Sequence, residues 1–149
     1  MTDSGIETDK LIEKGLKALE NGDTLSALVF FEKAYNIEQT PEICSYLGFC
    51  IAKERGQFSK GVALCEEAIK KEPNNSVLYL NLGRLYLFYN KKEQAVITFR
   101  EGLQQEMNQM ILEEFNRIGN RKPPVIPFLK RSNPINKYLG ILLKKLKLR

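Results

Sequence analysis

The chain has 149 residues, of which 43% are hydrophobic and 28% are charged, with a net charge of +5 and no histidine. This length and apolar content suffice for one domain with a buried core. Without histidine the sequence lacks the commonest general base and the commonest metal ligand. No other cluster of residues predicts a catalytic centre, so we expect neither an enzyme, nor a cofactor, nor a bound metal.

Charge is divided unevenly along the chain. Residues 1–119 carry 14 Lys or Arg and 18 Asp or Glu, whereas residues 120–149 carry nine basic residues and no acidic one. Such basic segments often meet acidic partners. The basic tail consists of Arg121, Lys122, Lys130, Arg131, Lys137, Lys144, Lys145, Lys147 and Arg149.

The sequence also bears on location. Its first residues are polar and acidic and lack the basic and apolar regions of a signal peptide. No apolar run approaches the ~20 residues of a membrane-spanning helix. Cys44, Cys50 and Cys65 are odd in number and have no framework spacing, which is typical of a reducing compartment. We expect a soluble, cytoplasmic protein without a membrane span.

Three segments share one pattern, in which apolar residues fall three or four apart and are interrupted once by turn-forming residues. That spacing predicts two helices joined by a turn in each segment. The segments are residues 11–37, broken at Asn21-Gly22-Asp23; residues 43–69, broken at Gly56-Gln57; and residues 77–103, broken near Asn90-Lys91. We therefore expect three pairs of antiparallel helices.

The segments are copies of one unit, because equivalent positions recur every 34 residues. Three columns share this period: Ala34, Ala68 and Gly102; Ala27, Gly61 and Ala95; and Phe31, Cys65 and Phe99. Cys65 stands where the other two units carry phenylalanine, and we expect it to be a small core residue.

Glycine recurs inside the first helix of each unit, as Gly15, Gly48 and Gly83. Glycine inside a helix costs about 1 kcal/mol relative to alanine. Three glycines at matched places therefore predict that the paired helices approach closely there. The middle unit has one residue more after its glycine, and we expect it to widen the turn around Glu54-Arg55.

Helix starts are also indicated. Thr40 followed by Pro41 is typical of a cap before the first helical residue. Asn75 or the serine after it can cap the next first helix. Ser4 and the glutamate three residues later have the spacing of a capping box, which could start the first helix early.

The chain resembles a known family, the tetratricopeptide repeats. The resemblance covers roughly residues 8–107 and is closest over 56–75 and 81–99, although the family's usual tryptophan is absent. It rests on Leu47-Gly48, Leu82-Gly83 and Tyr86, on Ala27, Phe31 and Ala34, on Gly61, Cys65, Ala68 and Pro73, and on Ala95 and Phe99. It implies an all-α fold, a right-handed superhelix of three repeats (about 8–40, 41–75 and 76–107), and a role as a protein-interaction scaffold.

The resemblance further implies that the first helices line a concave groove. Some family members bind chaperone C-termini there through basic and amide side chains, but Ile12 and Leu16 cannot clamp a carboxylate. Arg84 is the strongest candidate for binding an anion. The apolar residues could instead pack against neighbouring helices. The predicted groove residues are Ile12, Leu16, Phe49, Lys53, Leu80, Arg84, Leu87 and Phe88.

After the repeats we expect a capping helix over 108–119, because an end repeat needs a polar outer face. One of its faces carries Ile111, Leu112, Phe115 and Ile118, with Glu113, Glu114 and Arg117 elsewhere. Neighbouring carboxylates such as Glu113 and Glu114 are usually solvated.

Residues 120–133 contain prolines that forbid a helix and predict an extended basic arm. Residues 134–149 predict a basic amphipathic helix, which starts after Ser132 or Asn133 and has Ile135, Leu139, Leu142 and Leu146 on one face. The prolines, Asn133-Pro134 and Lys137-Tyr138-Leu139-Gly140 resemble small bacterial proteins of this repeat type.

Three interpretations of the tail remain open. It could fold back on the repeats, dock on an acidic partner such as a protein, RNA or a ribosomal surface, or lie on an anionic membrane. The membrane interpretation is weakened by the short helix and the absence of tryptophan. We expect an adaptor that holds a peptide or helix in an apolar groove, with the tail in a supporting role. The alternative is an RNA- or ribosome-associated factor that binds through the tail.

Overall fold

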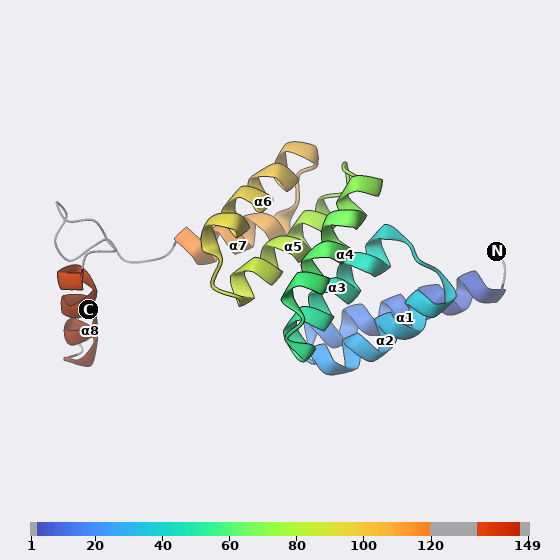
Figure 1. Ribbon diagram of the computed structural model, residues 1–149, viewed down its shortest axis with the longest axis horizontal. Helices are drawn as coiled ribbons and strands as arrows, with labels where there is room; N and C mark the ends of the chain where they lie inside the picture. The colour runs from blue at the N-terminus through green and yellow to red at the C-terminus, as the bar shows by residue number, and fades with distance from the viewer. Residues whose placement is uncertain (1–2, 120–133, 147–149) are drawn as a thin grey trace. The chain divides into compact units, whose positions relative to one another are not determined.

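The computed structural model describes residues 3–119 and 134–146 (Figure 1). All regular elements within these ranges are α-helices, which confirms the predicted all-α fold. The helices are α1 (Asp3–Glu20), α2 (Thr24–Ile37), α3 (Pro41–Arg55), α4 (Phe58–Lys71), α5 (Ser76–Phe88), α6 (Lys92–Gln105), α7 (Gln109–Gly119) and α8 (Pro134–Lys145). The chain forms two units, Met1–Phe115 and Asn116–Arg149. The predicted proline-rich arm at 120–133 lies outside the described residues.

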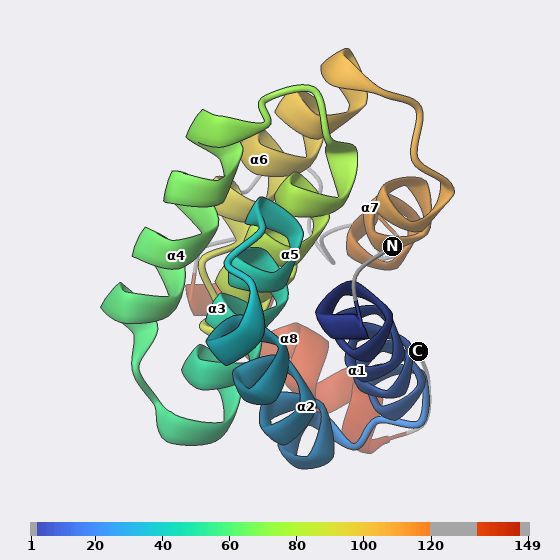
Figure 2. The ribbon, with the colours of Figure 1, turned by 90° about the vertical axis from the view of Figure 1, so that its right-hand side faces the viewer.

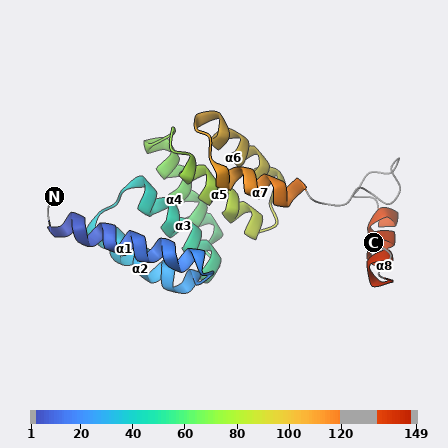
Figure 3. The same cartoon turned by 180° about the vertical axis from the view of Figure 1, so that it is seen from behind.

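The first unit is an array of three helix pairs, α1–α2, α3–α4 and α5–α6, as predicted (Figures 1 and 3). From α1 to α6 each helix packs against the next one along the chain, and α3 also packs against α5. The predicted breaks are the turns within the pairs. Each contains one residue with positive φ: Gly22 at 75°, Gly56 at 66° and Asn90 at 58°. In Figure 2, α4 and α7 lie on opposite sides of α5.

Side chains fix the starts of several helices. The Thr40 hydroxyl accepts a hydrogen bond from the Ile43 N–H at 3.3 Å. The side-chain oxygen Oδ1 of Asn75 accepts one from the Val77 N–H at 3.1 Å. These two predicted caps are confirmed. The first helix does start early, at Asp3, but Ser4 lies within its first turn rather than at a cap. The backbone carbonyl of Ser4 accepts a hydrogen bond from the Thr8 hydroxyl at 2.9 Å.

The recurring glycines mark the closest helix contacts, as predicted. A Cβ on Gly48 would lie 2.7 Å from the carbonyl oxygen of Gly61, so α3 and α4 touch backbone to backbone. A Cβ on Gly83 would lie 2.1 Å from the ring of Phe99, which instead fills the space above the glycine. The middle pair is closer because it carries Cys65 where the last pair carries phenylalanine.

The prediction of a wider turn around Glu54-Arg55 is wrong. Both residues belong to α3, which ends at Arg55, and only residues 56–57 separate it from α4. The additional residue therefore lengthens the helix. The left-handed conformation of Gly56, with φ of 66°, ends α3 and reverses the chain within two residues. At the end of α3, Arg55 also forms a 2.6 Å ion pair with Glu32 of α2.

A buried polar network joins the middle and last pairs. The Asn81 side chain donates a hydrogen bond to the Ser45 hydroxyl at 3.0 Å, and the Cys65 thiol donates to the Ser45 carbonyl at 3.4 Å. Cys65 is completely buried, which confirms its predicted place in the core. Burial raises the pKa of the Cys65 and Cys50 thiols to about 12, so both stay protonated near neutral pH.

Candidate functional site

Three of the predicted groove residues come together at the C-terminal ends of α3 and α5. Phe49 and Lys53 are four residues apart on α3 and therefore share a face. The Lys53 ammonium lies 5.8 Å from the ring centroid of Phe49 and 5.7 Å from that of Phe88 on α5. We call these three side chains the Lys53 cluster. It places a cation between two aromatic rings, at the distances of cation–π contacts.

The Lys53 cluster is accessible and rigidly supported. Phe88 is 51% exposed although it is a large apolar side chain. Its ring meets that of Tyr89 edge-on, with centroids 5.4 Å apart. The Tyr89 hydroxyl donates a 2.6 Å hydrogen bond to the carbonyl of Ala52, which ties the end of α5 to α3. Lys53 forms no ion pair with any described residue, so its charge is available to a ligand.

Arg84 is engaged within the protein. Its Nε donates a hydrogen bond to Glu114 Oε1 on α7 at 2.8 Å. The Glu114 side chain is only 9% exposed, so the expectation that this carboxylate is solvated is wrong. Glu114 follows Ile111 by three residues and shares the packed face of α7. Burial of that carboxylate is tolerated because the guanidinium compensates its charge, and the pair fastens the capping helix to α5.

Tyr46 lies on the same face of α3 as Phe49, but it was not among the predicted groove residues. Its ring stacks on Phe31 with centroids 4.9 Å apart. Burial and, to a smaller extent, the charge of Glu42 raise the pKa of Tyr46 to about 12, and the charge of Arg84 opposes this shift. The Tyr46 hydroxyl is therefore neutral and lies within electrostatic range of both charges. Its spacing of three residues from Phe49 on α3 was the available signal.

The aliphatic members of the predicted groove are mainly packing residues. Ile12 and Leu16 are partly buried and pack against the core of the first two helix pairs. Leu80 is 2% exposed and offers no surface to a ligand. Leu87 is partly buried. The structure thus brings together Phe49, Lys53 and Phe88, and leaves Leu80 within the core.

The basic tail is described only in part. Helix α8 begins at Pro134, as predicted, and Lys144 and Lys145 on it are exposed. Tyr138, Ile141 and Leu142 of α8 are exposed large apolar side chains, and so is Leu146 directly after the helix. The Lys137 side chain and the basic residues Arg121, Lys122, Lys130, Arg131, Lys147 and Arg149 lie outside what the structure describes.

Two further features bear on function. Among residues 3–119 and 134–146, no group of three or more His, Cys, Asp or Glu side chains could hold a metal ion. In the same part of the chain, every helix is too short or too polar to cross a membrane.

Stacked helix pairs with a 34-residue period, closed by a capping helix, define an α-helical repeat protein. Residues 64–97 match the family model of the tetratricopeptide repeat. The chain thus contains a tetratricopeptide repeat at residues 64–97, and the predicted superhelical repeat fold is confirmed. Among curated proteins, no relative matches the sequence.

Solved structures share this fold. The O-GlcNAc transferase of Thermobaculum terrenum (mutant K341M) matches 71% of this chain at 18% identity with a TM-score of 0.60, but the chain spans only 20% of its length. The first repeat domain of Spaghetti (RPAP3), bound to the HSP90 peptide SRMEEVD, matches 79% of this chain and 96% of its own at 20% identity and a TM-score of 0.59. The Sgt2 domain of Aspergillus fumigatus matches 85% of this chain and 92% of its own at 19% identity and a TM-score of 0.57. These identities show the fold alone.

Proposed function

We propose that the protein is a non-catalytic scaffold that binds a peptide or helix of a partner protein at the Lys53 cluster. The observation that carries this proposal is the half-exposed ring of Phe88 beside a lysine that forms no ion pair with the described residues. The similar Spaghetti domain binds a peptide, which supports a peptide ligand here. The proposed location is the cytoplasm, in keeping with three free, buried thiols.

The cluster defines the chemistry of the ligand. An apolar side chain packed on Phe88 would remove that ring from water, and a fully buried aromatic residue is worth about 1.5–3 kcal/mol relative to an exposed one. A carboxylate beside it would pair with Lys53. The ligand is therefore an apolar residue next to an acidic one. Since Glu114 already occupies Arg84 Nε, Lys53 rather than Arg84 is the proposed anion contact.

Selection from a displayed random-peptide library against the full chain provides ligands without assuming a partner. We expect the enriched peptides to combine an apolar residue with Asp or Glu. In fluorescence anisotropy, Phe88→Ala should weaken the best peptide about tenfold, as loss of an exposed aromatic anchor does. Leu25→Ala is the matched control, because Leu25 on α2 is an equally prominent apolar side chain, 61% exposed. Unchanged affinity in Phe88→Ala would contradict the proposal.

A second candidate function rests on α8. Tyr138 is 72% exposed on a helix whose described charged residues are basic, and an exposed aromatic ring among cations suits base stacking on RNA. Purification of the full chain followed by measurement of the 260/280 nm absorbance ratio would test this alternative. Nucleic acid that co-purifies and dissociates with salt would support it, whereas a clean protein spectrum with no salt-dependent RNA binding would remove it.

A further inference from the structure

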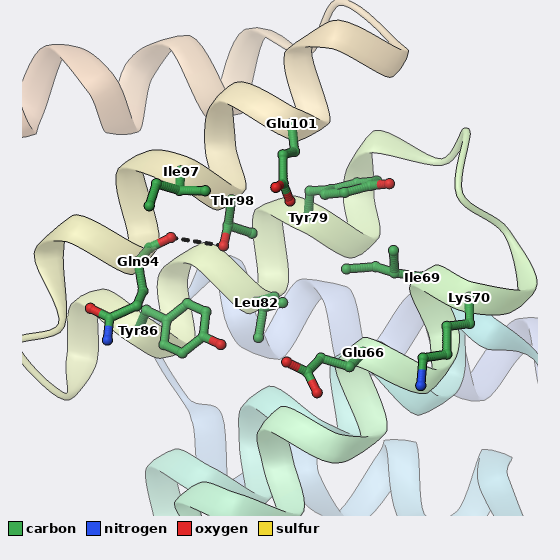
Figure 4. A pocket seen from close by; sticks show the side chains of 10 residues that line it. All are labelled: Glu66, Ile69, Lys70, Tyr79, Leu82, Tyr86, Gln94, Ile97, Thr98 and Glu101. Atoms are coloured by element: carbon green, nitrogen blue, oxygen red, sulfur yellow. Dashed lines mark hydrogen bonds between the residues drawn. The ribbon is translucent and has the colours of Figure 1, made fainter.

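A cavity of about 490 Å³ opens between α4, α5 and α6, and none of the residues that line it belongs to the Lys53 cluster (Figure 4). Its volume falls within the range of about 300–1,000 Å³ that is typical of ligand-binding cavities. Apolar side chains make up much of the lining, namely Ile69, Tyr79, Leu82, Tyr86 and Ile97.

The apolar part of the cavity is preformed and reaches solvent. Leu82 of α5 is 5% exposed and forms the base, whereas Ile97 of α6 is 55% exposed at the edge. The Tyr79 hydroxyl donates a 2.8 Å hydrogen bond to the carbonyl of Pro73, which fixes its ring as a wall. An inserted aliphatic side chain would therefore meet a rigid apolar surface without prior rearrangement.

Two carboxylates stand on either side of this apolar surface. Glu66 projects from α4 and Glu101 from α6, with Leu82 between them (Figure 4). Burial raises the pKa of Tyr86, and the charges of Glu66 and Glu101 both raise it further, so both carboxylates lie within range of one ring. Neither forms an ion pair with a described residue.

The cavity has one basic lining residue. Figure 4 shows Lys70 on the far side of Glu66 from Tyr86, at the α4 edge of the cavity. The apolar base is thus flanked by negative charge, and the single cation stands at the periphery. A ligand with basic groups on both sides of an apolar side chain complements this arrangement, whereas an acidic ligand would be repelled.

We propose that this cavity docks a basic amphipathic segment of a partner protein, with an aliphatic side chain placed over Leu82 and Lys or Arg residues paired with Glu66 and Glu101. This surface lies on the second helices of two repeats and on α5, and it is distinct in chemistry from the Lys53 cluster, which takes an acidic ligand. The two proposals do not depend on each other.

The test uses the full chain and two fluorescein-labelled synthetic peptides with identical leucine positions. In one the intervening residues are lysine, and in the other they are glutamine, so that neither peptide carries the acidic residues proposed to bind the Lys53 cluster. We expect fluorescence anisotropy to show saturable binding of the lysine peptide, weakened by salt, and none of the glutamine peptide. Absence of lysine-peptide binding, or equal binding of both peptides, would overturn the proposal.

Variants localise the binding. The double substitution Glu66→Gln/Glu101→Gln should weaken the lysine peptide at least about fivefold, because it removes both proposed ion pairs. The matched control is Glu7→Gln/Glu13→Gln, which removes two exposed carboxylates from α1. Equal losses in both double variants would show non-specific attraction and overturn the site. Ile97→Ser should also weaken the peptide, but with an unchanged salt dependence.

Thermal unfolding followed by circular dichroism verifies that each variant is folded, and glutamine at these exposed positions should leave the transition unchanged.

Light scattering on the full chain tests a different occupant of the cavity, a second copy of this chain. We expect a monomer. A dimer that dissociates in Glu66→Gln/Glu101→Gln would overturn the partner proposal and identify a second copy of this chain as the occupant.

Discussion

The backbone contact between α3 and α4 leads to the sharpest stability prediction, the effect of Gly61→Ala. A Cβ at this position would lie 2.5 Å from the carbonyl oxygen of Gly48 and 2.7 Å from the Cβ of Ala52. Neither neighbour is the end of a flexible side chain, so the two helices would have to separate. The separation would also disturb Leu85 of α5, whose Cδ1 would lie 3.1 Å away.

The expected magnitude follows from two opposing effects. Overpacking a close-packed core costs about 1–3 kcal/mol, and a contact with backbone atoms belongs at the upper end of that range. Alanine gains about 1 kcal/mol over glycine within a helix. We therefore expect Gly61→Ala to lower the free energy of unfolding by about 2 kcal/mol and the melting temperature by about 4–8 °C.

Urea unfolding followed by circular dichroism at 222 nm measures this change. Ser59→Ala, at an exposed position of the same helix, is the matched control, and we expect it to leave stability unchanged or slightly raised. If Gly61→Ala proved as stable as the natural chain, helix propensity would outweigh the contact. The explanation of the glycine column as a packing requirement would then be refuted.

Three further predictions concern buried polar groups. Arg84→Ala removes the guanidinium that lies 2.8 Å from the buried Glu114 carboxylate, and we expect the free energy of unfolding in urea to fall by about 2 kcal/mol, more than for Lys53→Ala on the open face. Cys50 and Cys65 have pKa values raised by burial from 9.0 to about 12, so between those values the unfolded chain releases protons that the folded chain retains. Stability should therefore fall as pH rises above about 9, by at most about 1.4 kcal/mol per pH unit for each thiol, and Cys50→Ala/Cys65→Ala should flatten this dependence. Tyr46 has a pKa of about 12, so we expect it to be among the last tyrosines to ionise when the absorbance at 295 nm is followed with rising pH. That late increase in absorbance should be absent from Tyr46→Phe.

The fold was largely predictable because the repeat period carries structural information. Residues 34 apart, such as Phe31 and Cys65, occupy equivalent places, so a substitution in one unit reveals how its packing differs from that of the others. The glycine column predicted close contacts, and Gly48 and Gly61 confirm them. The spacing of the glycines did not determine whether the additional residue of the middle unit belongs to α3 or to the turn after it. That outcome depends on Gly56, whose left-handed conformation ends α3 after Arg55.

The candidate site was less predictable because it depends on contacts between helices. The burial of Glu114 is decided by Arg84, 30 residues earlier in the chain, and an acidic neighbour such as Glu113 gives no sign of it. Likewise, Lys53 and Phe88 meet only because α3 packs against α5. A helical face identified Phe49 and Lys53 together, but it could not exclude Leu80, whose burial depends on the surrounding helices.

The two proposed surfaces use the same repeat in different ways. Helix α5 contributes Phe88 to the Lys53 cluster and Leu82 to the base of the cavity. These residues are six apart, about 240° of rotation at 100° per residue, so they point to different sides of the helix. One side offers a cation beside an apolar ring, and the other offers carboxylates beside an apolar base. Because the two proposed surfaces would attract ligands of opposite charge, our proposals together predict that they select different partner segments, an acidic one at the Lys53 cluster and a basic one at the cavity.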